Sequence, residues 1–361
     1  MNNRFDLAIW LESDELPRTD QQEANGDSRA SGTSGIQVHL NFWKLPKCNA
    51  VDIGINFPIF KNGKVNIFID TTSKIEAEDI TYKLKDDNII NTIFNEFINS
   101  ETCKEQIGCR KCKRSSGQAD FFCLRCLDDS PNLKQDKKYN GTLITFNISA
   151  IKCIIPCDCK RQYIRIRLSG EAINKIYIKD KIPAARLQYY TSRIDFLDFR
   201  LNNVRSLPQS LTSKVVYPTL DSIRCFLMLE SGEELTLHNK GYKKVRAIEK
   251  EKWPNYLEAL TPYVNNKDES GTTSLFQKCK EYFKKFLPSG RKKNKFILAY
   301  QWSTDTPDQD FSLFVQIKRS DFFIRTVMFF ILITTFFGLF PSVLAPYVDK
   351  GIKHLWQLIF G

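Results

Sequence analysis

The chain has 361 residues, and 53 Lys and Arg against 41 Asp and Glu give it a formal net charge of +12. With 42% hydrophobic and 26% charged residues, the composition excludes a wholly disordered chain and a transporter with many membrane segments. Three histidines argue against a metalloenzyme built on several of them, whereas eleven cysteines direct attention to cysteine chemistry.

The N-terminal part alternates apolar and polar residues in a way that is typical of β-strands. Between the first two predicted strands, segment 12–35 is polar and rich in Ser, Gly, Asp and Glu, so we predict a disordered insertion there. A segment at 89–98 has the apolar spacing of an amphipathic helix. The predicted strands of this part are 5–11, 36–43, 51–60 and 65–69.

Four cysteines form two Cys-x2-Cys pairs within residues 101–130, where basic residues exceed acidic ones. Four thiolates at this spacing can surround one tetrahedral Zn²⁺, which leaves no open position for water, so the spacing predicts a structural zinc module at 101–130. A cytoplasmic setting would disfavour disulfides as the explanation. The predicted ligands are Cys109, Cys112, Cys123 and Cys126.

Four further cysteines lie near this module in sequence, at positions 103, 153, 157 and 159. Cys103, Cys153, Cys157 and Cys159 could form a second four-thiolate zinc site, exchange with the first set or remain buried thiols. The basic residues around the first pair would also permit contact with nucleic acid, although we favour a structural role for the loop.

The rest of the chain returns to the two-residue alternation of strands, for example at 163–168 and 195–200, with a predicted hairpin around 297–317. We therefore expect an α+β fold whose β-rich body carries the zinc module as an insertion. Two domains are expected, one at 1–205 and a second α+β domain at 206–320.

A basic amphipathic helix is predicted at 274–287, directly before more basic residues. Such a helix binds anionic lipid headgroups, although it can equally pack on its own domain and expose a basic face to water. The residues predicted to face a membrane surface are Lys278, Lys280, Lys284, Lys285, Arg291, Lys292 and Lys293.

An uncharged run of 23 residues at 326–348 is long enough, at about 1.5 Å per residue, to cross a hydrocarbon core of about 30 Å. We therefore predict a transmembrane helix at 322–348, with a kink or end close to Pro341. Residues 349–361 would form a short interfacial tail. Because no signal peptide is recognisable, we expect one pass through the inner membrane and a body in the cytoplasm.

The sequence contains none of the common phosphate-loop, serine-hydrolase or zinc-protease motifs. Asp195, Asp198, Arg200 and Asn202 cluster in one predicted strand, where a carboxylate–arginine pair could serve a site or form an ordinary ion pair. We predict no catalytic residue.

These observations favour a non-enzymatic, membrane-anchored, zinc-stabilised protein that binds a partner or senses a signal. Self-association of its body could bring several membrane helices together, as in a bacterial antiviral defence or toxin-like effector. One alternative is a membrane-tethered nuclease or other hydrolase, whose carboxylates would come from dispersed strands. Another alternative is a zinc protein that binds nucleic acid.

Overall fold

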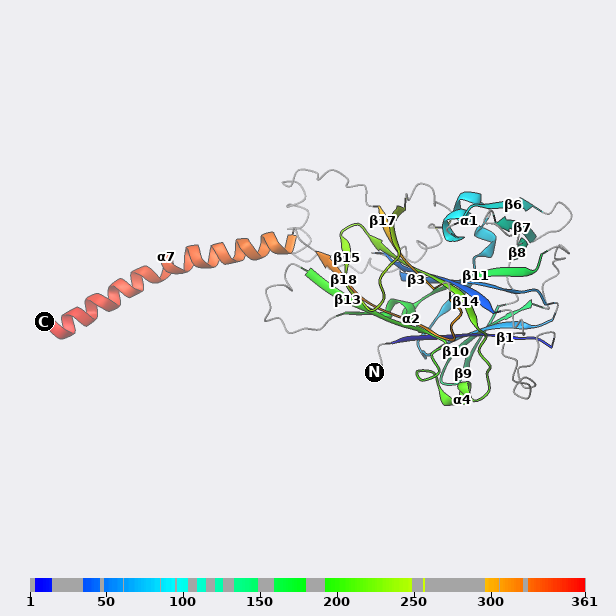
Figure 1. Cartoon of the computed structure of the whole chain (residues 1–361). Coiled ribbons are helices and arrows are strands. Elements are labelled where there is room, and N and C mark those ends of the chain that lie inside the picture. Colours follow the sequence, from blue (N-terminus) through cyan, green and yellow to red (C-terminus); the bar gives the residue numbers. More distant parts are fainter. Residues whose placement is uncertain are drawn as a thin grey trace, which may run out of the picture.

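The structure is a computed structural model, and it describes the greater part of the chain. The described residues are 4–14, 35–45, 49–60, 62–84, 86–94, 96–102, 109–114, 121–125, 133–148, 159–179, 192–248, 256, 296–304, 306–320 and 324–360. Within these ranges the chain is β-rich, and its strands form two large sheets (Figure 1).

The first sheet, sheet A, has eight strands among the described residues. They are β1 (Phe5–Glu12), β4 (Lys64–Ile69), β9 (Leu133–Lys138), β10 (Gly141–Asn147), β12 (Tyr177–Lys179), β13 (Ser192–Leu201), β15 (Glu233–His238) and β18 (Phe311–Ser320). Their order is β15–β18–β13–β1–β4–β10–β9, and β12 pairs with β13. All of these pairs are antiparallel except β1 with β13.

The second sheet, sheet B, has ten described strands. They are β2 (Ile36–Lys44), β3 (Asn49–Pro58), β5 (Glu76–Asp79), β6 (Ile98–Thr102), β7 (Cys109–Arg114), β8 (Phe121–Arg125), β11 (Arg161–Ser169), β14 (Leu220–Glu230), β16 (Lys244–Ile248) and β17 (Ile297–Thr304). Their order is β16–β17–β14–β2–β3–β11–β8–β7–β6, and β5 pairs with β11. Strand β14 runs parallel to β2, and β8 runs parallel to β11.

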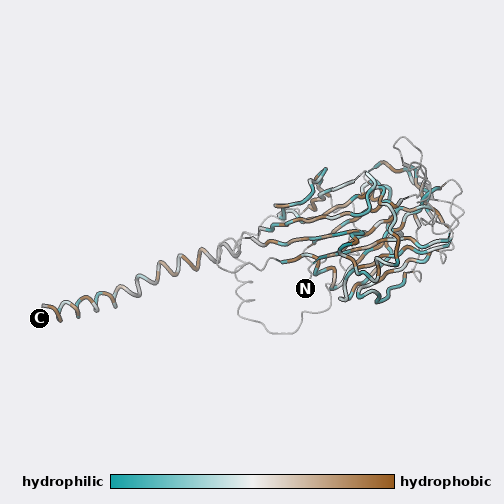
Figure 2. The backbone as a smooth tube through the Cα atoms, turned by 60° about the horizontal axis from the view of Figure 1, so that its bottom comes forward, coloured by the Kyte–Doolittle hydropathy of each residue, from teal (hydrophilic) through white to brown (hydrophobic). Residues whose placement is uncertain are grey.

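The two sheets pack face to face, because alternate residues of their strands enter one shared core. Phe5, Leu7 and Ile9 of β1 lie in this core with Ile164 and Ile166 of β11. The residues between them point the other way and meet smaller clusters on the outer faces. Figure 2 shows the resulting mixture of apolar and polar positions along the strands.

Short helices lie beside the sheets. Four buried residues of α1 enter the cluster on the outer face of sheet B, and Leu211 of α4 enters the cluster on the outer face of sheet A. The described helical segments are η2 (Thr81–Lys83), α1 (Asp87–Phe94), α2 (Glu171–Asn174), α4 (Gln209–Thr212) and α7 (Ile324–Phe360). Only α7 is long, so the expected α+β class was wrong, and the described fold is a β-sandwich with a C-terminal helix.

Strands from both sides of the predicted boundary at residue 205 contribute to both sheets. β14 lies between β2 and β17, and β13 lies between β1 and β18. The predicted insertion at 12–35 lies outside the described residues except at its two ends.

Helix α7 follows β18 and extends away from the sheets (Figures 1 and 2). Among the described residues, no helix has both the length and the apolar character needed to cross a membrane, so the prediction of a transmembrane helix at 322–348 was wrong. The apolar run is not a separate element, because the same helix continues through Asp349, Lys350 and Lys353. Pro341 and Pro346 lie inside α7 and do not end it.

Candidate functional site

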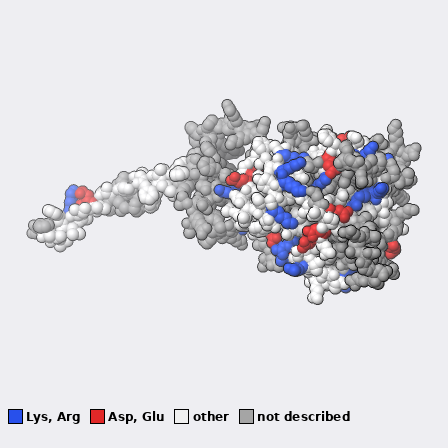
Figure 3. Space-filling view, in the orientation of Figure 1, with Lys and Arg blue, Asp and Glu red and all other residues white. Residues whose placement is uncertain are grey.

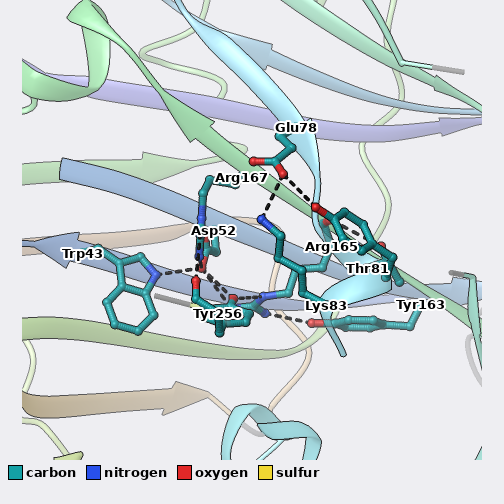
Figure 4. Close-up of polar contacts among 10 residues, drawn as sticks. Trp43, Asp52, Glu78, Thr81, Lys83, Tyr163, Arg165, Arg167 and Tyr256 are labelled. Atoms are coloured by element: carbon teal, nitrogen blue, oxygen red, sulfur yellow. Dashed lines mark hydrogen bonds and ion pairs between the residues drawn. The ribbon is translucent and has the colours of Figure 1, made fainter. Parts of the chain in front are cut away.

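A group of charged and aromatic side chains is buried on the outer face of sheet B (Figure 4). Tyr163, Arg165 and Arg167 alternate along β11 with residues that enter the shared core, so all three point outward. Asp52 of β3 lies opposite Arg167, and Gly54 lies opposite Arg165. A Cβ atom on Gly54 would lie 1.9 Å from the Tyr163 hydroxyl, so only glycine leaves room for these side chains.

Asp52 is the centre of this network. Arg167 donates from Nε to Asp52 Oδ1 at 2.7 Å and from Nη2 to Oδ2 at 3.0 Å. The Tyr256 hydroxyl and Trp43 Nε1 each donate to Oδ2 at 2.7 Å. The carboxylate therefore joins β2, β3 and β11 to a residue that lies far away in the sequence.

Arg165 connects the network to a second aromatic group. Its Nε donates to the Tyr256 hydroxyl at 2.7 Å, and its Nη1 donates to the Tyr163 hydroxyl at 2.9 Å. Its Nη2 lies 3.8 Å from Asp52 Oδ2. His39 packs against Tyr163 with ring centroids 5.6 Å apart.

The network is charged at neutral pH. Burial alone would raise the pKa of Asp52, but Arg167 and Arg165 overcome this effect and lower it. Burial raises the pKa of Tyr256 and of Tyr163 above their usual range. The charged carboxylate and its two arginines therefore fix Tyr256 to the sheet.

A second buried cluster joins the two sheets. Lys44 at the end of β2 contacts Asp195 of β13 at 3.1 Å and Glu233 of β15 at 2.5 Å. Its ammonium group lies 5.8 Å from the ring centre of Tyr177. Arg319, near the end of β18, lies 3.9 Å from Glu233. This cluster therefore ties sheet B to the two strands that flank β18.

The polar residues predicted to cluster along β13 do not form one site. Asp195 contacts Lys44, whereas Asp198 and Arg200 form a pair at 3.3 Å that is partly exposed. Asn202 accepts a hydrogen bond from the Ile9 backbone N–H at 2.8 Å. Asp195 and Asn202 therefore each connect two strands, whereas the Asp198–Arg200 pair lies within β13.

The predicted zinc module was wrong for the part of the chain that the structure describes. No three His, Cys, Asp or Glu side chains in that part are arranged to hold a metal. Cys123 is disulfide-bonded, and a disulfide sulfur is not a thiolate ligand. Cys112 and Cys159 are buried in separate strand and loop positions. Cys103, Cys126, Cys153 and Cys157, and the side chain of Cys109, lie outside the described residues.

The residues predicted to bind anionic lipid also lie outside the described residues. This holds for the helix at 274–287 and for Lys278, Lys280, Lys284, Lys285, Arg291, Lys292 and Lys293. Their role stays a prediction from the sequence.

Helix α7 carries the largest apolar surface that the structure leaves uncovered. Leu355 is 62% exposed and Trp356 is 65% exposed, and similar values hold for eleven other large apolar side chains along the helix. Val348, Gly351, Ile352, Leu355, Trp356 and Ile359 line a shallow apolar groove near its C-terminal end. An apolar surface of this extent on an isolated helix is typical of an interaction site.

Comparisons with known proteins do not extend this description. The chain matches no protein-family model and no curated protein sequence.

Sequence reasoning missed the Asp52 network, although part of its signal was visible. The predicted strand at 163–168 alternates Tyr and Arg with Ile and Leu, so two arginines had to share one face. Arginines on a buried face require a carboxylate, but the sequence alone does not show that β3 is the neighbour that supplies one. Tyr256 had no recognisable signal.

Proposed function

We propose that this chain is a non-catalytic binding protein that uses α7 to associate with protein. The observation that carries this proposal is the exposed apolar surface of α7. A continuous exposed apolar surface marks an interaction site. Burying each large apolar side chain of that surface against a partner would contribute about 1.5–3 kcal/mol to the free energy of association.

The arrangement of the body supports this role. The shared core lies between the two sheets, and none of its members among the described residues comes from α7. The helix leaves the body immediately after β18 and points outward (Figure 1). Its surface is therefore available without any rearrangement of the body.

The hydrolase and nucleic-acid alternatives stay predictions that no geometry in the described residues favours. The cytoplasmic location of the body also stays a prediction. Association through α7 follows from fewer assumptions, because it requires only the exposed residues of one helix.

The proposal is tested by sedimentation velocity of the full chain over a wide concentration range. We expect the unmodified chain to associate, and we expect the double variant Ile352→Glu, Leu355→Glu to weaken association by about tenfold or more, because it places charge in the groove. The matched control Lys350→Gln, Lys353→Gln changes the opposite side of the same turns. Equal behaviour of all three chains would refute α7 as the association surface.

A further inference from the structure

We propose that two copies of this chain pair through α7 in antiparallel orientation along one stripe of exposed residues. This inference rests on the proposed function and names the partner of the same surface. The stripe, called the seam below, starts at Thr334 and ends at Ile359.

The seam follows alternating steps of four and three residues along α7. Its N-terminal half consists of the compact residues Thr334, Gly338, Pro341 and Ala345. Its C-terminal half consists of the larger apolar residues Val348, Ile352, Leu355 and Ile359. All eight are exposed, and each lies in continuous helix.

This spacing is the one by which two helices stay in contact over a long distance. Apolar residues every 3.5 positions keep one stripe facing the partner, and a pattern sustained for about three to four heptads indicates a coiled coil. At about 1.5 Å per residue, the seam is about 38 Å long. A partner that covered only a short apolar patch would not require this spacing to continue along the whole seam.

The polar groups of the C-terminal half avoid the seam. Lys350, Lys353 and Gln357 lie on the opposite side of the helix, at the spacings that place residues on one face. Lys353 Nζ donates to Asp349 Oδ2 at 2.8 Å on that side. Figure 3 shows α7 without charge on its described surface except for one group near its C-terminal end.

The polar atom within the seam is already satisfied by the helix itself. The Thr334 hydroxyl donates to the Phe330 carbonyl at 2.7 Å. Thr334 can therefore face an apolar partner without leaving an unpaired donor in the contact.

The distribution of residue size selects the antiparallel orientation. When the centre of the antiparallel helix pair lies between Ala345 and Val348, each compact residue of one helix faces a large residue of the other. Gly338 then faces Leu355 of the partner subunit, and Pro341 faces Ile352 of the partner subunit. Thr334 and Ala345 face the partner's Ile359 and the partner's Val348. Large residues opposite small ones interlock at constant helix separation.

A parallel pair would lack this complementarity. It would place Gly338 against the same glycine and Ile352 against the same isoleucine, so the two helices would be too far apart at one end and crowded at the other. The antiparallel pair is a closed twofold contact that leaves both bodies at opposite ends of the helices.

A lipid surface is the other occupant that an apolar helix could have. Lipid requires only apolar side chains, and it gives no reason for compact residues in one half of a stripe to match large residues in the other half. The small-to-large register of the seam therefore favours a second copy.

Disulfide cross-linking of full-length variants tests the pairing. Gly338→Cys and Leu355→Cys are made separately; a side chain at 338 meets no atom within 4 Å, so the helix accepts it. Under mild oxidation, we expect a covalent dimer when the two variants are mixed, and no dimer beyond that of the unmodified chain from either variant alone. Lys353→Cys, on the opposite side, is the matched control and gives no added dimer.

Sedimentation equilibrium supplies the second measurement, and a mass of two chains is expected. Cross-linking of each variant with itself would show parallel helices and overturn the inference, as would a mass above two. A chain that is monomeric in buffer but floats with phosphatidylcholine vesicles would assign the surface to lipid and also overturn it. If association is lost in the Ile352→Glu, Leu355→Glu chain while the cross-links fail, the proposed function stands and the inference alone is refuted.

Discussion

The β-sandwich and α7 distribute charged and apolar residues in opposite ways. The sandwich buries Arg165 and Asp52 completely, and it surrounds Leu313 so that none of that side chain is exposed. In α7, Leu355 is 62% exposed. The sandwich therefore contains the interactions that stabilise it, whereas α7 leaves its apolar surface exposed, and the proposed function assigns to that surface a partner outside the body. Each of the following predictions alters either a buried interaction of the sandwich or the exposed surface of α7.

The largest effect is expected from Asp52→Ala. The change removes the carboxylate and leaves two buried guanidinium groups without a counter-charge, which typically costs about 3–5 kcal/mol of the free energy of unfolding. Urea denaturation of the two chains measures it. The control Asp198→Ala removes one partner of the partly exposed pair with Arg200, for which about 1 kcal/mol or less is expected. Similar losses in both variants would show that burial of the network contributes little.

The next effect depends on pH and concerns Asp79. Burial raises the pKa of this carboxyl to about 6, partly opposed by hydrogen bonds from Thr81. Because the folded pKa lies above the unfolded value of 3.8, the folded state binds the proton more tightly. This contribution is fully present below about pH 4 and is lost as the pH rises through 6, with a total of about 3 kcal/mol.

The measurement is the free energy of unfolding between pH 4 and 7.5. Asp79→Asn should flatten the decrease seen in the unmodified chain, because an amide does not titrate. The control Asp136→Asn changes an exposed residue of β9 and should leave the decrease in place. A decrease of equal size in the Asp79→Asn chain would assign it to other groups.

A smaller effect is expected from Gly54→Ala. The added methyl group would lie 1.9 Å from the Tyr163 hydroxyl, so Tyr163 and Arg165 must move, at a typical cost of about 1–3 kcal/mol. Gly241→Ala is the control, because a Cβ atom there meets nothing within 4 Å. Thermal unfolding followed by circular dichroism distinguishes the two. An unchanged melting temperature for Gly54→Ala would contradict the close packing of this face.

The smallest effect on the body is expected from Leu355→Ala. At concentrations where the chain is monomeric, this exposed residue should change the free energy of unfolding by less than about 0.5 kcal/mol. The same substitution at Leu313, in the shared core, should cost about 2–5 kcal/mol. If Leu355→Ala destabilised the body by a comparable amount, α7 would have to be packed against it.

The strands were the most predictable part of this fold. Segments such as 5–11 and 163–168 alternate regularly, and the structure places a strand over each. Their partners were not predictable, because β1 pairs with β13 and β2 pairs with β14, and nothing local in a sequence specifies a neighbour about 190 residues away. For the same reason the Asp52 network could not be assembled from its separate parts.

The errors at the two strongest motifs have different physical origins. The spacing of Cys109, Cys112, Cys123 and Cys126 is compatible with zinc, but it does not determine the distances between sulfur atoms in the folded chain. The apolar run at 326–348 lies in a helix, but the prediction that it crosses a membrane was wrong for the described residues. The helix also continues beyond its two prolines, because a proline weakens a helix without always ending it.

The parallel pairing of β14 with β2 has a consequence for folding. Leu220 pairs with Ile36, and sheet A is likewise completed only when β18 pairs with β13. Contacts between such distant positions require the closure of very long loops, which makes folding slow. During synthesis, edges of the strands made earlier therefore stay unpaired until residues beyond 310 have been synthesised. The body and α7 therefore become available to a cell at nearly the same moment, which limits the time in which an apolar helix is exposed on an unfinished protein.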